Sequence, residues 1–279
     1  MTPPDPHAIA RAAGSSVAAT HPVRGGDVCE ALRIDLSDGR SLFVKHLPGP
    51  PAGMFAAEAA GLSWLAATGA VHTPPVVAVG DDWLALGWVE PGTPEARTDE
   101  VLGRGLARMH RAGAAAFGAD HPGFIGPLAV PNDSRDTWPA FLAECRLIPL
   151  ARVAGLDPGD GALLERVMAR LGDLADPAEP PARLHGDLWA GNRMTDSTGC
   201  PVLVDAAAYG GHREVDLAMM RLFGGFSDRV FAAYAEEYPL APGWEERVEM
   251  NQLIPLLVHA ALFGGAYRAS VHRVLSVLA

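Results

Sequence analysis

Residues 184–192 read Leu-His-Gly-Asp-Leu-Trp-Ala-Gly-Asn, and the rest of the sequence can be understood outward from this stretch. Its polar residues His185, Asp187 and Asn192 have the spacing H-x-D-x-x-x-x-N. A carboxylate such as Asp187 can orient and deprotonate an attacking hydroxyl group. An amide oxygen such as that of Asn192 can hold a divalent cation beside it. The stretch therefore predicts a loop that combines a base with a metal ligand.

A second acidic residue follows the loop in the sequence, and it is expected to lie beside Asp187 and Asn192. Residues 201–205 read Pro-Val-Leu-Val-Asp, an apolar strand that ends in Asp205, 13 residues after Asn192. Taken singly, each acid is more simply explained as a turn or helix-capping residue. The three polar groups in this order match the catalytic loop and metal ligand of phosphotransferases, with Asp205 as the main Mg²⁺ ligand.

The lysine content points to a third part of the same site. Of the 22 basic residues, 21 are arginine, and the single lysine is Lys45. It lies on a predicted strand at 41–47, and Glu58 lies on the helix predicted next, at 53–68. In kinases, a Lys–Glu pair in this context directs the ammonium group at the α- and β-phosphates. The alternative is a surface ion pair that contributes little stability.

The remaining nucleotide contacts have weaker signals. The chain has no Walker motif and no complete G-x-G-x-x-G. Gly25 and Gly26 are the candidate loop over the phosphates, although two adjacent glycines more often form a plain turn. By analogy with kinases, the adenine is expected between the two lobes, where backbone groups of Gly87 and Val89 would bind its edge.

The pattern along the chain predicts an α+β protein with two lobes. The first third reads mostly as strands and the remainder as helices, which suggests an ATP-binding lobe at 1–90 and a catalytic lobe at 91–279. The predicted strands are 28–36, 41–47, 76–79, 83–89, 183–184 and 201–205. The predicted helices, besides 53–68, are 100–112, 138–153, 160–172, 215–224, 228–237 and 244–278, the last broken near Pro255 and Gly264-Gly265. Residues 113–137 read as loop.

Composition excludes several classes of protein. The chain has 279 residues, 49% of them hydrophobic and 20% charged, and a net charge of −11 without runs of like charge. This argues against binding to nucleic acid or to an anionic membrane. The three cysteines lie far apart, which argues against a disulfide framework or a zinc cage. With neither a signal peptide nor a membrane-spanning stretch in the sequence, we expect a soluble, cytoplasmic protein.

Taken together, the motifs resemble one known family. The stretches 185–192, 202–205, 213–219 and 222–226 are similar to the fructosamine kinase (ketosamine-3-kinase) family, which belongs with the aminoglycoside phosphotransferases on the protein-kinase-like fold. Further matching stretches are 25–28, 43–45, 54–62, 132–133, 138–141, 146–147 and 262–264. The match therefore extends over most of the chain, and a small antiparallel N-terminal lobe with one main helix is expected.

The resemblance implies a reaction and a set of roles. The family uses ATP and Mg²⁺ to phosphorylate the 3-hydroxyl group of a ketoamine sugar, free or protein-linked, which would repair glycated amines. It implies that Asp187 is the base, that Asn192 and Asp205 hold the metal, and that Lys45 with Glu58 positions ATP. Asp216 would brace the catalytic loop by accepting its backbone N–H groups, with His185 as further support. We expect a monomer.

Residues for the acceptor are less well defined. Trp189 could pack its ring on the sugar, or it could be a core residue; Asn132 and Trp138 are further substrate candidates. The sequence departs from the family at Ala206-Ala207, where a proline is usual, and at Ser134, Asn251 and Val258. These positions fall where an acceptor could bind. Cys29 is interpreted as a packing residue, with a thiol switch as the alternative.

Other functions stay open at this point. The same fold could phosphorylate an aminoglycoside, choline or another amino sugar. The chain could also be a nucleotide-binding pseudokinase, although the intact Lys45, Asp187 and Asp205 argue against that. A hydrolase with a metal on His185, Asp187 and Asp205 would be active without ATP.

Overall fold

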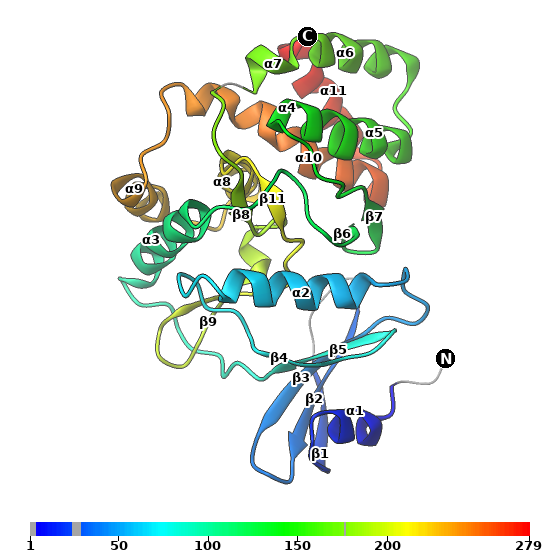
Figure 1. The fold of residues 1–279 in the computed structure, drawn as a ribbon, viewed down its shortest axis with the longest axis vertical. Helices are drawn as coiled ribbons and strands as arrows, with labels where there is room; N and C mark the ends of the chain where they lie inside the picture. Colours follow the sequence, from blue (N-terminus) through cyan, green and yellow to red (C-terminus); the bar gives the residue numbers. More distant parts are fainter. Residues whose placement is uncertain (1–3, 24–28, 176) are drawn as a thin grey trace.

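The computed structural model describes residues 4–23, 29–175 and 177–279 and has two lobes (Figure 1). The N-terminal lobe is a five-stranded antiparallel sheet with the order β1-β2-β3-β5-β4. Its strands are β1 (Val17–Val23), β2 (Glu30–Leu36), β3 (Ser41–His46), β4 (Val76–Val79) and β5 (Trp83–Gly87). The predicted α+β class and the protein-kinase-like architecture are confirmed.

Strand alternation decides which side chains face the active site. On one face of the sheet, Ile34 and Leu42 pack with Ile9 of helix α1 (Pro6–Ala12). The opposite face packs against helix α2 (Met54–Ala66), which lies between the sheet and the helical lobe (Figure 1). Because neighbouring residues of a strand point to opposite faces, Lys45 of β3 is directed to the α2 side.

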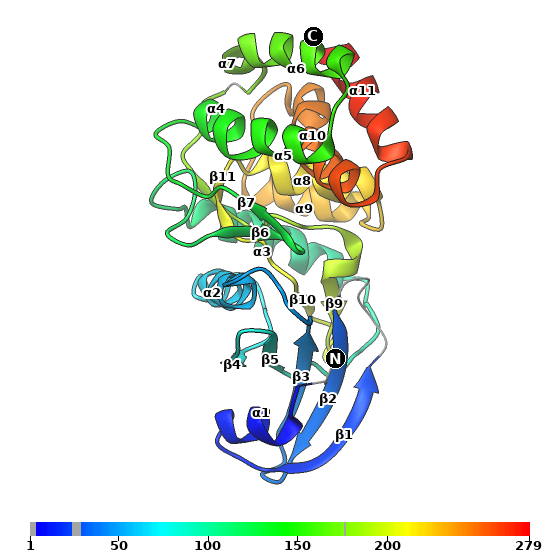
Figure 2. The ribbon, with the colours of Figure 1, turned by 90° about the vertical axis from the view of Figure 1, so that its right-hand side faces the viewer.

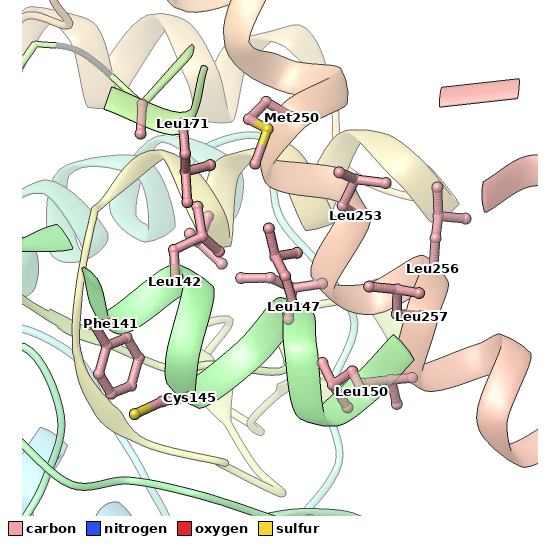
Figure 3. Packing of buried hydrophobic residues seen from close by; sticks show 14 of the residues in the cluster. Phe141, Leu142, Cys145, Leu147, Leu150, Leu171, Met250, Leu253, Leu256 and Leu257 are labelled. Carbon is pink, nitrogen blue, oxygen red and sulfur yellow. The ribbon is translucent and has the colours of Figure 1, made fainter. Parts of the chain in front are cut away.

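The C-terminal lobe is built mainly of helices around one large hydrophobic cluster. Leu142, Leu147 and Leu150 pack against Met250 and Leu253 of the longest helix (Figure 3). The helices are α3 (Thr98–Arg111), α4 (Trp138–Phe141), α5 (Ile148–Ala154), α6 (Pro158–Ala169), α7 (Leu171–Leu174), α8 (Glu214–Phe223), α9 (Asp228–Glu237), α10 (Trp244–Phe263) and α11 (Ala266–Leu278), with a π-helical turn η1 (Leu142–Leu147) between α4 and α5. Among the described residues no helix has the length and apolar character to cross a membrane.

Two sequence-based expectations about this lobe are wrong. Helix α10 continues through Pro255 and ends only at Gly264, which has a positive φ of 62°. An interior proline costs a helix about 3 kcal/mol, but the turns on both sides of Pro255 are buried, and their packing offsets that cost. Within the expected loop 113–137, the short strands β6 (Gly123–Ile125) and β7 (Leu128–Val130) pair with each other.

Two small pairs of strands hold the catalytic segments. Strand β8 (Ala182–Leu184) pairs with β11 (Tyr209–Gly211), and β9 (Arg193–Thr195) pairs with β10 (Pro201–Leu203). A single 3-10 turn, η2 (Ala190–Asn192), lies between β8 and β9, near the junction of the lobes (Figure 2). The segments 185–189 and 204–208 are therefore fixed at both ends and lie next to each other.

The two lobes share a core. A cluster of buried side chains joins Phe55 and Leu62 of α2 to Leu106 of α3 and to Leu188 and Leu203 beside the catalytic segments. Backbone bonds add to this contact, since Leu203 N–H donates to His72 O at 2.8 Å. The lobes are therefore packed against each other, and a boundary at residues 90–91 stays a prediction.

Candidate active site

The structure brings Lys45, Glu58 and Asp205 together from three separate segments. Lys45 Nζ lies 2.5 Å from Glu58 Oε2 and 2.9 Å from Asp205 Oδ1. The lysine side chain is 10% exposed, that of Glu58 12%, and that of Asp205 48%. The ammonium group is therefore held from inside by Glu58 of α2 and faces the half-exposed Asp205 on its other side.

Burial shifts the pKa values of the charged groups in this cluster. Desolvation raises the pKa of Glu58 to about 7, even though the Lys45 ammonium opposes the shift. Desolvation acts to lower the pKa of Lys45, but the attraction of Glu58 and Asp205 outweighs it and raises that pKa above its ordinary value. Among the described residues, Glu58 Oε1 has no hydrogen-bond partner. Glu58 therefore depends on Lys45 for its charge compensation.

This dependence gives a prediction about Lys45. Replacing it with methionine, Lys45→Met, leaves Glu58 buried without its cation, so Glu58 takes up a proton and is left without a hydrogen-bond partner. The free energy of unfolding therefore falls by about 1–3 kcal/mol. The double variant Lys45→Met/Glu58→Leu recovers most of that stability but not the nucleotide affinity. Urea denaturation and ATP titration measure the two properties separately. Equal stability of the two variants would contradict this reading of the pair.

The catalytic loop places Asn192 directly against Asp187. Asn192 Nδ2 donates to the Asp187 backbone oxygen at 2.8 Å and to its carboxylate Oδ2 at 3.0 Å. The amide nitrogen is thereby used within the loop, which leaves the amide oxygen as the group able to bind a cation. Burial raises the pKa of Asp187 to about 7, with the Asn192 bond opposing and the Asp205 charge adding to the shift. A pKa near neutrality suits a general base.

The backbone of this loop is held from behind by Asp216 of α8. Its two carboxylate oxygens accept the N–H groups of His185 and Gly186 at 2.7 and 2.9 Å. Gly186 has a φ of +81°, and a Cβ there would lie 2.2 Å from Ala207 O, so no other residue fits. Asp216 occupies the place that the sequence predicted for a bracing acid.

His185 is fully buried and both of its ring nitrogens are engaged. Nε2 lies 2.9 Å from Val204 O, and Nδ1 accepts the Asp187 N–H at 3.3 Å. Burial lowers the pKa of His185. The ring therefore joins the loop to the segment before Asp205, and it has no nitrogen left for a metal. In the described part of the chain, no three His, Cys, Asp or Glu side chains form a metal-binding group.

Asn192 and Asp205 fit a magnesium ion better than a protein-enclosed metal. Mg²⁺ prefers oxygen ligands and is usually held by one or two protein groups together with substrate phosphates. The Asn192 amide oxygen and the half-exposed Asp205 carboxylate are such groups. Asp205 is also the one described non-glycine residue with a positive φ, 56°. Asp and Asn tolerate that conformation better than most other residues do. Asp205 lies two residues after the end of β10.

The predicted adenine-binding groups are at the end of β5. The Gly87 N–H donates to Pro75 O at 2.8 Å. In an antiparallel pair the partner residue would normally donate its own N–H to the Gly87 carbonyl. Pro75 has no N–H, so the Gly87 carbonyl can accept a hydrogen bond from another donor. The next residue, Trp88, donates its N–H to Ser41 O at 2.9 Å, and Val89 follows it. Gly25 and Gly26 lie outside the described residues.

The three substrate candidates differ in how far their side chains are exposed. The Trp189 side chain is 41% exposed, and a Cβ on Gly191 would lie within 2.2 Å of its ring. Its ring therefore covers the turn that leads to Asn192. By contrast, Trp138 is 3% exposed and stacks on Phe141 in the core.

Asn132 is also part of the interior. Its side chain donates to His121 O at 3.3 Å and accepts from the buried Arg146 at 2.9 Å. Asn132 and Trp138 are therefore both held inside the catalytic lobe, and a contact of either residue with substrate stays a prediction. The sequence around residues 132 and 138 does not show that these two side chains are buried.

Sequence reasoning overlooked one residue of the site. His110, near the end of α3, is fully buried and lies 3.2 Å from Asp216 Oδ2. A histidine at the end of an amphipathic helix is an ordinary feature, and its partner lies 106 positions further along the chain. No local pattern could have connected the two.

The fold and these groups define a class of protein, a phosphotransferase with the protein-kinase-like fold. In keeping with this, the chain superimposes on a macrolide 2'-phosphotransferase from Brachybacterium faecium with a TM-score of 0.62 at 18% identity, over 96% of each chain. The particular family follows from a family model: residues 6–279 match the fructosamine kinase family, and the chain belongs to it.

Individual relatives agree over nearly the full length. A protein from Thermus thermophilus named "probable ketoamine kinase" is 39% identical over 278 residues, which is 98% of this chain and 99% of the relative. The crystal structure of a Thermobifida fusca protein provisionally assigned as a fructosamine-3-kinase has a TM-score of 0.91 at 44% identity. It covers 98% of this chain and 99% of its own. The likeness therefore includes both lobes.

Proposed function

We propose that this protein transfers the terminal phosphoryl group of ATP to a hydroxyl group of a ketoamine sugar. Membership of the fructosamine kinase family supports the ketoamine as acceptor and ATP as donor. The names of the two relatives, ketoamine kinase and fructosamine-3-kinase, support the same acceptor class and its 3-hydroxyl group. The observation that carries the chemistry is the buried Lys45, bonded to Glu58 and Asp205.

The side chains would divide the work as follows. When ATP binds, the Lys45 ammonium group would exchange its contact with Asp205 for the phosphates, which frees the Asp205 carboxylate for the metal. Glu58 would keep the Lys45 side chain oriented. Asn192 and Asp205 would hold Mg²⁺, which neutralises charge on the phosphates when bound. Asp187 accepts the proton of the attacking hydroxyl group, and its bond from Asn192 keeps the carboxylate aimed in one direction.

The acceptor would approach Asp187 beside Trp189. An exposed aromatic ring next to the base offers an apolar surface to the C–H groups of a sugar. The ketoamine also carries a secondary amine that is cationic at neutral pH, and a tryptophan ring favours such a charge. We propose that Trp189 binds the ketoamine, whereas Trp138 and Asn132 pack in the core of the catalytic lobe.

A phosphorylation screen tests this function. The purified protein is incubated with ATP and Mg²⁺ and, in separate reactions, with ribulosamine and fructosamine derivatives of lysine, an aminoglycoside and choline. We expect ADP release and a mass increase of one phosphate with the ketoamines. Turnover of the aminoglycoside or choline without any ketoamine would refute the acceptor class. Absence of turnover with every acceptor, while ATP still binds, would favour a pseudokinase.

A further inference from the structure

The side chain of Arg183 connects helix α2 of the N-terminal lobe to the strand that leads into the catalytic loop. Arg183 lies on β8, two residues before His185, and pairs with Gly210 of β11. Its Nη1 donates to Trp64 O of α2 at 2.8 Å, and its guanidinium group lies 4.8 Å from the centre of the Trp64 ring. Its Nε donates at 2.9 Å to the carbonyl of Gly113, just after the end of α3. One part-buried guanidinium group therefore bonds the ends of two helices.

The bond to Trp64 O completes the C-terminal end of α2. In a continued helix Trp64 O would accept the Thr68 N–H, but that group donates to Leu65 O at 3.2 Å. The last turn of α2 has no basic residue of its own. A cation is favoured there, because this is the negative end of the helix dipole. Arg183, 119 positions further along the chain, supplies both the missing donor and the missing charge.

A second contact places α2 against the segment that follows Asp205. Gly61 lies three residues after Glu58 on α2 and faces Ala208, since a Cβ on Gly61 would lie 3.0 Å from that of Ala208. The lack of a side chain at Gly61 thus lets α2 come close to the catalytic segment. Residues three apart on a helix are neighbours on its surface. This contact and the pair of Glu58 with Lys45 therefore share one side of α2.

We propose that Arg183 is a positioning residue for ATP, which fixes the C-terminal end of α2 and through it the Glu58 carboxylate that orients Lys45. The proposal rests on the proposed function. Glu58 lies six residues before Trp64, about 9 Å along the axis of the same helix. Without Arg183, Trp64 O loses its donor and the end of α2 loses its bonded link to β8. The helix can then shift, which weakens the 2.5 Å contact between Glu58 and Lys45 and leaves the ammonium group less well aimed at the phosphates.

The test compares variants of two arginines that each bond a carbonyl at the end of a helix. Arg183→Met removes the charge and both bonds, and Arg183→Gln leaves one donor nitrogen without the charge. Arg170→Met is the matched control, because Arg170 Nη1 donates to Leu278 O at 3.0 Å at the end of α11, far from α2 (Figure 1). In an ATP titration with Mg²⁺, we expect Arg183→Met to lower the affinity by at least about 5-fold, the loss of one hydrogen bond. Arg183→Gln should lower it by less, and Arg170→Met should bind ATP as the wild type does.

A second measurement reports on the helix itself. Hydrogen–deuterium exchange of the peptide that includes residues 54–66 should become faster in Arg183→Met and stay unchanged in Arg170→Met. Wild-type ATP affinity together with wild-type exchange of this peptide in folded Arg183→Met would overturn the proposal. If that variant does not fold, the same result in Arg183→Gln would overturn it. A wild-type protein that binds ATP but phosphorylates no ketoamine refutes the proposed function instead, and these two measurements still decide the role of Arg183.

Discussion

Asp187→Asn is expected to lower kcat by about 10²–10⁴-fold, the contribution typical of a positioned general base. The substitution keeps the shape of the side chain and its hydrogen bond from Asn192, but it removes the carboxylate that accepts the proton of the hydroxyl group. The affinity for ATP should change little, since Lys45 and Asp205 are untouched. Steady-state kinetics with the ketoamine and a fluorescence titration with ATP measure the two quantities.

The control for this prediction is Asp81→Asn, which removes the same charge from an exposed turn of the N-terminal lobe. It should leave both kcat and ATP affinity unchanged. If Asp187→Asn retained the kcat of the wild type while Asp81→Asn did the same, Asp187 would not be the base. If ATP affinity fell along with kcat, Asp187 would act on the nucleotide and not on the acceptor.

Asp205→Asn is expected to cause the second large loss of activity, because it weakens the binding of the metal ion. Asparagine tolerates the positive φ of this position, so the backbone can keep its conformation while the charge is lost. A metal ion on the phosphates contributes several kcal/mol to the transition state. Since each 1.36 kcal/mol is a factor of ten in rate, kcat/KM for ATP should fall by about 100-fold or more.

The dependence on Mg²⁺ separates this effect from a change in folding. The Mg²⁺ concentration for half-maximal activity should rise in Asp205→Asn, while the melting temperature changes little because the side chain is half exposed. Asp205→Ala is the comparison, because it adds backbone strain to the loss of charge and should also lower the melting temperature. An unchanged Mg²⁺ requirement in Asp205→Asn would show that Asp205 does not hold the metal.

Features with a local cause could be predicted from the sequence. The strand at Ser41–His46 follows from its alternation and the turn before it, and this places Lys45 on the face toward α2. The spacing within 185–192 likewise brings Asp187 and Asn192 into contact, because both lie on one short loop. The helices ended near the glycines where the sequence placed them, at Gly69 and at Gly264-Gly265.

Features that depend on distant parts of the chain could not be predicted. Pro255 breaks an isolated helix, but in α10 it is surrounded by the core, and packing decides the outcome. Trp138 lies in a stretch shared with the family, yet only the fold shows that its ring stacks on Phe141. The bond between His110 and Asp216 joins two helices whose sequences carry no sign of each other.

Strand β1 and helix α1 illustrate a different limit. The strand has seven residues, contains Pro22 and has no buried residue, so its alternation of apolar and polar positions is weak. The helix has only seven residues, although Asp5 caps its first turn by accepting the His7 N–H at 2.9 Å. Both elements are stabilised by packing on β2 and on the outer face of the sheet, which a reading of single segments does not include.

The most direct test is a crystal structure with Mg²⁺, a non-hydrolysable ATP analogue and a ketoamine. We predict the metal on Asn192 and Asp205, the Lys45 ammonium group on the α- and β-phosphates, and the acceptor's 3-hydroxyl group within hydrogen-bonding distance of Asp187. A nucleotide bound away from Lys45, or a ketoamine whose hydroxyl groups all lie far from Asp187, would contradict the account.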